Sequence, residues 1–116
     1  MMPQVLFFED PHPLRQREAA MPAYAHHFPA WSEQTNAMHQ YVVWTALEAE
    51  GCGANLQHYN PLIDERVKAQ WGIDQEWKLR AQLVFGGLKE GAREGLKEKD
   101  LEARKRTGTF FYGMKG

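Results

Sequence analysis

Five histidines and one cysteine are the side chains of this 116-residue chain best suited to metal ligation or nucleophilic catalysis. No two histidines stand four residues apart, and His26 and His27 point to different faces of a helix or strand, so no metal site is expected. Cys52 and His58 could form a nucleophile pair, although Cys52 lies between glycines with no orienting acid nearby. The alternatives are a small buried thiol and half-exposed histidines, His12 and His39 included.

The most distinctive segment follows an apolar helix and reads Asn-Leu-Gln-His-Tyr-Asn-Pro at residues 55–61. Gly51 and Gly53 precede it, and glycine permits positive φ angles and a close approach of the backbone to a flat or tightly packed neighbour. The segment is therefore interpreted either as a ligand-contacting turn or as an ordinary helix terminus and turn. The glycines elsewhere form neither a GxGxxG nor a Gly-Lys-Ser/Thr phosphate loop.

Apolar patterns in the first half of the chain predict the elements that position this segment. Val5–Phe8 is a short apolar run typical of a buried strand, and residues 11–29 are predicted to be loop with a short helix. The best helix is predicted over Ser32–Glu50, capped by Ser32 or Asn36 and largely buried. One apolar face recurs at three- and four-residue steps and contains Met38, Tyr41, Val42, Thr45 and Ala49. The apolar surface is widened by Val43, Trp44, Ala46 and Leu47.

The second half is predicted to hold one helix and at least one strand. Residues 51–61 are expected to be irregular, and residues 64–71 to form a helix that ends at Gly72. Trp77–Leu83 alternates strictly, with apolar residues at odd positions, which is typical of a half-buried strand. Residues 107–112 could form a last strand beyond a highly charged stretch.

Composition favours one soluble domain. Hydrophobic residues make up 43% of the chain and aromatic residues 12%, which argues against a disordered segment. The net charge is −1, with −4 over residues 1–88 and +3 over residues 89–116, so neither nucleic acid nor a membrane is an expected partner. No apolar run approaches the roughly 20 residues of a membrane span. No signal peptide is expected at the start. We therefore expect a cytoplasmic location.

Four blocks resemble the nitroreductase family in their order and spacing, and they cover about residues 4–88. They are Val5–Asp10, Phe28–Gln34, Trp44–Asp64 and Trp77–Gln82. The nearest branch is the fungal and bacterial one that resembles stress-response nitroreductases. The resemblance implies an α+β fold, with a sheet wrapped by helices, in a single truncated domain over residues 1–116 whose residues 89–116 form a charged C-terminal tail.

The resemblance implies an FMN-dependent oxidoreductase that works as a homodimer. Hydride would pass from NAD(P)H to the flavin N5 and then to a nitroaromatic, a quinone or a similar small-molecule acceptor. Because the flavin performs the redox step, no catalytic side chain is predicted. The alternative is a non-catalytic remnant that acts at most as a dimerisation or interaction module.

Matching positions carry the implied site residues. Leu56, Gln57, His58 and Tyr59 correspond to the segment whose backbone lies against the flavin ring, with a peptide N–H near His58 donating to N5. Phe28 and Trp31 correspond to the acceptor pocket, and the alternative for them is core or interface packing. Arg104 and Arg106 correspond to a basic pair for the FMN phosphate, and the alternative is a solvated helix end.

Family members are nearly twice as long, and their first half carries Arg-Arg-Ser and Asn-Ser-Gln segments that bind FMN. Those segments do not occur here, so the chain resembles a C-terminal half. The strand at Val5–Phe8 is then expected to lose the sheet neighbours that the first half normally provides. Exposed strand edges with an uncovered apolar helix are expected to favour self-association.

Overall fold

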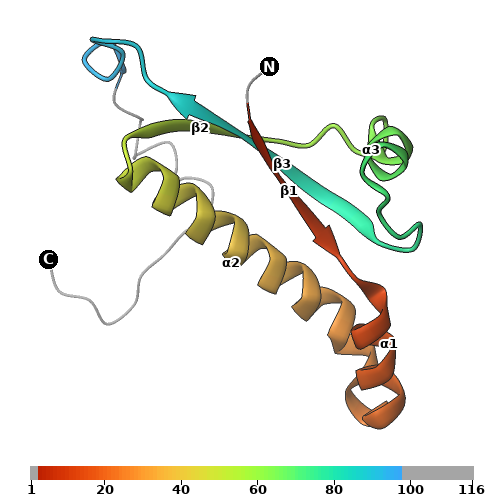
Figure 1. The fold of residues 1–116 in the computed structure, drawn as a ribbon. Coiled ribbons are helices and arrows are strands. Elements are labelled where there is room, and N and C mark those ends of the chain that lie inside the picture. The colour runs from red at the N-terminus through yellow and green to blue at the C-terminus, as the bar shows by residue number, and fades with distance from the viewer. Residues whose placement is uncertain (1–2, 98–116) are drawn as a thin grey trace, which may run out of the picture.

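The computed structural model describes residues 3–97, which form a unit of helices packed around a small antiparallel sheet (Figure 1). The elements in chain order are β1 (Gln4–Glu9), α1 (Pro11–Ala20), the 3₁₀ helix η1 (Pro22–His27), α2 (Phe28–Ala49), β2 (Cys52–Gln57), α3 (Asp64–Trp71) and β3 (Lys78–Gly87). The predicted last strand at 107–112 lies outside the described residues.

The sheet has three strands in the order β1-β3-β2, so the last described strand lies between the two earlier ones. Both neighbours pair with β3 in the antiparallel sense. Figure 1 shows α2 lying along one side of the strands, with α3 beyond them on the other side.

The core lies between the sheet and α2. Phe7, Ala81 and Leu83 are buried at its centre, and Leu83 has no exposed surface. Six partly buried apolar side chains from both layers pack against them: Val5, Val43, Trp44, Leu47, Ala54 and Leu56. The α+β fold with helices around a sheet is thus confirmed.

The long helix differs from its prediction in its first residue and in its buried face. α2 begins at Phe28 rather than near Ser32, since Pro29 is tolerated in the first turn of a helix, where no N–H is needed. Neither Ser32 nor Asn36 caps it. The predicted burial of the whole apolar surface is wrong: Met38, Tyr41 and Val42 are more than 60% exposed, and only the part with Val43, Trp44 and Leu47 packs on the sheet.

The segment predicted to be irregular contains a strand. Cys52–Gln57 pairs residue by residue with β3, from Cys52 opposite Gly87 to Gln57 opposite Gln82. Its glycine, alanine and asparagine have low strand propensity, so only the pairing with β3 reveals it. Gly51, at φ +89°, reverses the chain between α2 and β2, where a residue with a side chain would be strained.

Three other predicted elements, two strands and one helix, are confirmed, and only the limits of the strands differ. The strand Val5–Phe8 lies within β1, and the helix Asp64–Trp71 ends at Gly72 as predicted. The segment 11–29 contains two short helices rather than one. β3 runs on to Gly87, and its central place in the sheet buries Gln82 at an even position, so the predicted half-buried alternation is wrong there.

Candidate functional site

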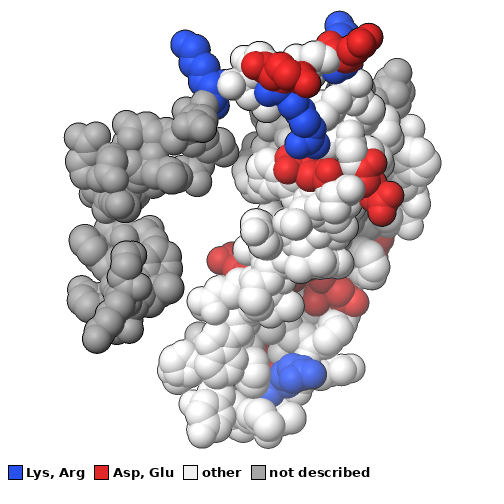
Figure 2. All heavy atoms as spheres, turned by 90° about the vertical axis from the view of Figure 1, so that its left-hand side faces the viewer, with Lys and Arg blue, Asp and Glu red and all other residues white. Residues whose placement is uncertain are grey.

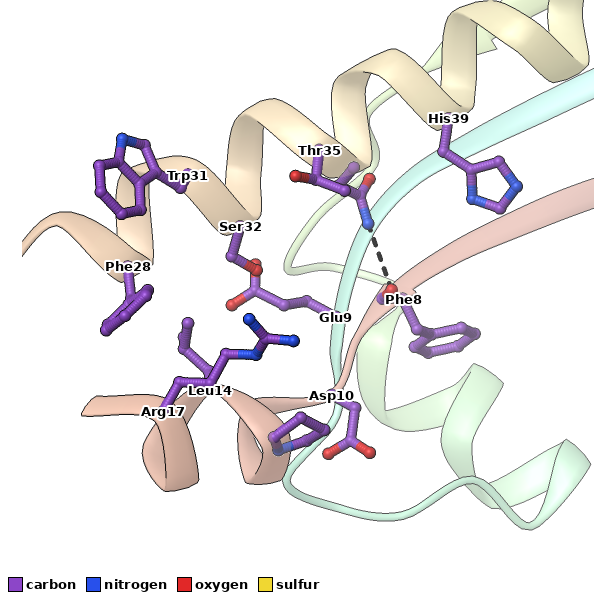
Figure 3. A pocket seen from close by; sticks show the side chains of 12 residues that line it. Phe8, Glu9, Asp10, Leu14, Arg17, Phe28, Trp31, Ser32, Thr35 and His39 are labelled. Atoms are coloured by element: carbon purple, nitrogen blue, oxygen red, sulfur yellow. Dashed lines mark hydrogen bonds between the residues drawn. The ribbon is translucent and has the colours of Figure 1, made fainter. Parts of the chain in front are cut away.

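A cavity of about 600 Å³ opens between α1, the end of β1 and the first half of α2 (Figure 3). The Phe28 and Trp31 rings contribute from the first turn of α2, with centroids 5.6 Å apart and an edge-to-face orientation. The His27 ring stacks on Trp31 at 5.1 Å. The two residues predicted to shape an acceptor pocket therefore lie together in one cavity.

Polar groups line the remaining wall of the cavity. Asn36 donates from Nδ2 to the Phe8 carbonyl at 3.2 Å, the contact drawn in Figure 3, and receives a hydrogen bond from Gln40 at 2.6 Å. The bond to Phe8 fixes α2 to β1 at one side of the cavity, and the bond from Gln40 orients the Asn36 amide within α2. The other residues that line it, from α1, β1 and α2, are Glu9, Asp10, Pro13, Leu14, Arg17, Ser32, Thr35 and His39.

Glu9, one of the residues that line the cavity, forms an ion pair with Arg80. The Glu9 carboxylate is 7% exposed and accepts from Nε and from one Nη of Arg80, at 3.1 and 3.0 Å. The same Arg80 nitrogen lies 3.5 Å from Glu33 on α2. Arg80 reaches these acids because the strand register shifts beside it: Phe7 pairs with Ala81 and Phe8 with Leu79, which leaves Arg80 unpaired as a β-bulge.

Helix α1 forms one side of the cavity, and contacts near its N-terminus hold it in place. The Asp10 carboxylate caps it by accepting from the His12 N–H at 3.0 Å. On the outer side, His12 and Arg15 approach Glu76 at 3.2 and 3.1 Å, ahead of β3. These exposed ion pairs each contribute little to stability, so the cap and the buried contacts set the position of α1.

The predicted flavin-contacting residues lie at the end of β2, and none of them lines the cavity. Leu56 and Gln57 are the last residues of the strand, and the Leu56 side chain packs against the core. His58 and Tyr59 follow in an exposed turn. The His58 Nδ1 lies 3.1 Å from the Arg80 carbonyl, to which it donates when that nitrogen carries the proton.

The predicted site residues thus fall into two groups that the described structure does not merge. Phe28 and Trp31 share the cavity, residues 56–59 form the end of β2 and its turn, and Arg104 and Arg106 lie outside the described residues. Arg80 links the two regions, because its carbonyl contacts His58 and its guanidinium holds Glu9 in the cavity wall.

Sequence reasoning missed four residues with clear structural roles: Glu9, Arg80, Gln82 and Asn60. Only Gln82 left a signal, as an amide in a strand whose neighbours Ala81 and Leu83 are apolar. Within residues 3–97, no group of three or more metal-ligating side chains could hold an ion, and no helix there has the length and apolar character to cross a membrane.

Comparison with known proteins gives a consistent set of relatives, although no family model matches the chain. The Saccharomyces cerevisiae proteins HBN1 and nitroreductase FRM2 are 42% and 40% identical to it over 82 residues, which is 71% of this chain and 42% of each relative. The chain therefore spans less than half the length of the curated relatives it matches.

Solved structures agree with the sequence comparison. The nitroreductase CinD from Lactococcus lactis, in a complex with chloramphenicol, superimposes with a TM-score of 0.71 at 43% identity, over 83% of this chain and 56% of that one. A nitroreductase from Saccharomyces cerevisiae gives a TM-score of 0.66 at 36% identity, over 77% of this chain and 49% of that one.

Proposed function

The chain is related to nitroreductases in sequence and fold over about half of their length. On this premise we propose that it acts as an FMN-dependent NAD(P)H oxidoreductase. The observation that carries the proposal is the agreement with CinD, at 43% identity over 83% of this chain. Bound FMN would supply the redox chemistry, accepting hydride and passing it to an organic acceptor.

The donor groups of the described residues fit the ring of a flavin. The turn at His58 and Tyr59 is exposed and offers the His58 peptide N–H next to the edge strand β2, while the Tyr59 N–H is bonded to Gln82. Peptide donors that are fixed in place stabilise charge where it develops without reorganising. Arg104 and Arg106 are proposed to neutralise the FMN phosphate, and these two residues lie outside the described range.

The cavity beside α1 is proposed to take the electron acceptor. The Phe28 and Trp31 rings, set edge to face, form an apolar aromatic part of its wall, which suits an aromatic acceptor such as a nitroaromatic or a quinone. CinD, the structural relative, has been solved in complexes with chloramphenicol, with 4-nitrophenol and with nicotinic acid. Those aromatic ligands support the proposal by similarity.

A titration of FMN with the purified chain tests the proposal. We expect saturable quenching of flavin fluorescence and, with NADPH, reduction of 4-nitrophenol. Trp31→Ala is expected to raise KM for the acceptor about tenfold, the effect of losing one aromatic contact, and to leave the Kd for FMN unchanged. Absence of quenching, both alone and with the remaining part of CinD supplied as a separate polypeptide, would contradict the proposal.

We also propose that the chain forms a homodimer through the exposed face of α2. Met38, Tyr41 and Val42 are 63%, 70% and 62% exposed, an unusual set on one helix. Figure 2 shows that the charged side chains visible in that view gather mostly toward one end. The exposed face of α2, defined by these three apolar side chains, has no covering element within residues 3–97.

Sedimentation equilibrium measures this association. We expect a particle about twice the 13.4 kDa of the chain, and Tyr41→Glu is expected to weaken dimerisation at least about tenfold because it places a charge in an apolar contact. Leu62→Glu, at a side chain that is 84% exposed and lies near α3, is the matched control. A monomer at all concentrations would contradict the proposal.

The same face supports a second candidate function, a non-catalytic interaction module. The chain spans 42% of its curated relatives and retains this helix. A dimer that fails to quench FMN fluorescence would favour the module over the oxidoreductase. The cytoplasmic location and a role in stress response stay predictions.

A further inference from the structure

Gln82 is the polar side chain most deeply buried among the described residues, at 1% exposure in the middle of the central strand. Its neighbours along β3, Ala81 and Leu83, are fully buried and apolar. An amide in such a place is tolerated only when its donor and acceptor are both used. Both are used here, and both bonds go to the turn that follows β2.

The two bonds of Gln82 hold consecutive residues of that turn. Oε1 accepts from the Tyr59 N–H at 2.8 Å, and Nε2 donates to Asn60 Oδ1 at 3.2 Å. Asn60 in turn donates to Asp64 at 2.8 Å, at the start of α3. One side chain of β3 therefore fixes the turn to the sheet and, through Asn60, to the next helix.

The turn has a further attachment to the same strand. The His58 ring lies 3.1 Å from the Arg80 carbonyl, so residues 58–60 contact β3 at two points, through Arg80 and through Gln82. Tyr59 itself is 54% exposed. An exposed turn that is held by buried polar anchors keeps one backbone conformation in water, which is what a preorganised donor requires.

We propose that Gln82 is a positioning residue for the flavin-contacting turn, an inference that rests on the proposed function. Because Gln82 already occupies the Tyr59 N–H, the peptide donor that the turn offers to the flavin is that of His58. An apolar side chain of similar length would fill the strand equally well but would release the turn. Gln82 thus acts through the backbone of residues 58–60 and does not contact the cofactor.

The test compares Gln82→Met with Leu83→Met in the full chain. Methionine matches the length of glutamine and removes both hydrogen bonds, so we expect the Kd for FMN, from fluorescence quenching, to rise about tenfold. Amide hydrogen exchange at Tyr59 should accelerate in the same variant. Leu83→Met perturbs the adjacent core position, and it should lower Tm while leaving FMN affinity and Tyr59 exchange unchanged.

Asn60→Ala supplies an intermediate variant, because it removes the outer of the two bonds. Its Kd for FMN should rise less, about threefold, and the double variant Gln82→Met/Asn60→Ala should be no worse than Gln82→Met alone, since both act through one network.

Three results separate this inference from the proposed function. Wild-type FMN affinity in Gln82→Met overturns the role of Gln82 and leaves the oxidoreductase proposal intact. Equal losses of affinity in Gln82→Met and Leu83→Met also overturn it, because the effect would then come from the core. If the unsubstituted chain fails to quench FMN fluorescence, the proposed function fails and the positioning role fails with it.

Discussion

Leu83→Ala is expected to lower the free energy of unfolding by about 3 kcal/mol, because it leaves a cavity at a fully buried position. Leu83 lies on the central strand, opposite Val5 of β1 and Leu56 of β2, so its side chain joins both edge strands to the core under α2. For a chain of this size the loss corresponds to a drop in Tm of roughly 10–15 °C. Urea and thermal unfolding followed by circular dichroism measure it.

Two further substitutions make the result interpretable. Leu83→Val removes one methylene and should cost about 1 kcal/mol, which keeps the position testable where the alanine variant is too unstable to purify. Leu62→Ala, at a side chain that is 84% exposed, should change stability by less than about 0.5 kcal/mol. Similar losses for Leu62→Ala and Leu83→Ala would mean that the core does not lie where the structure places it.

Arg80→Met is expected to destabilise the fold by about 2 to 3 kcal/mol, because it leaves the Glu9 carboxylate buried without its cation. The effect should fall short of that for a fully enclosed pair, since Arg80 keeps 31% of its side chain exposed. Glu9, which Arg80 holds in place, lines the cavity, so the Kd for an aromatic ligand such as 4-nitrophenol should rise in the same variant. Chemical unfolding and ligand titration measure the two effects.

A double-mutant cycle separates the ion pair from the loss of arginine itself. Glu9→Gln/Arg80→Met removes both charges, so it should recover at least half of the stability lost in Arg80→Met. Glu33→Gln is the control, because Glu33 lies 3.5 Å from Arg80 but is 64% exposed and should contribute less than about 0.5 kcal/mol. A double variant as unstable as Arg80→Met would show that the pairing with Glu9 is not the cause.

Local patterns were sufficient to predict several elements. The apolar run at Val5–Phe8, the helix Asp64–Trp71 with its terminal Gly72, and the odd-position alternation of Leu79, Ala81 and Leu83 all correspond to observed elements. These signals depend on residues within one or two turns of each other, and such short-range preferences act in any context. The similarity to nitroreductases was likewise contained in the order of the four blocks.

Tertiary contacts decided the rest. The long helix is apolar around most of its circumference, so its sequence allowed two buried faces, and only the sheet chose Val43, Trp44 and Leu47 over Tyr41 and Val42. β2 has weak strand propensity and exists because β3, some thirty residues later, supplies its hydrogen-bond partners.

The same distinction holds for the candidate site. Phe28 and Trp31 are close in sequence, and the resemblance to nitroreductases assigned both to the acceptor pocket. Glu9 and Arg80 are 71 residues apart, and Gln82 lies 23 residues from the Tyr59 amide that it holds. A charge or an amide can be buried without a large free-energy cost only when its partner is present. A partner that is distant along the chain is brought there by the packing of the whole fold.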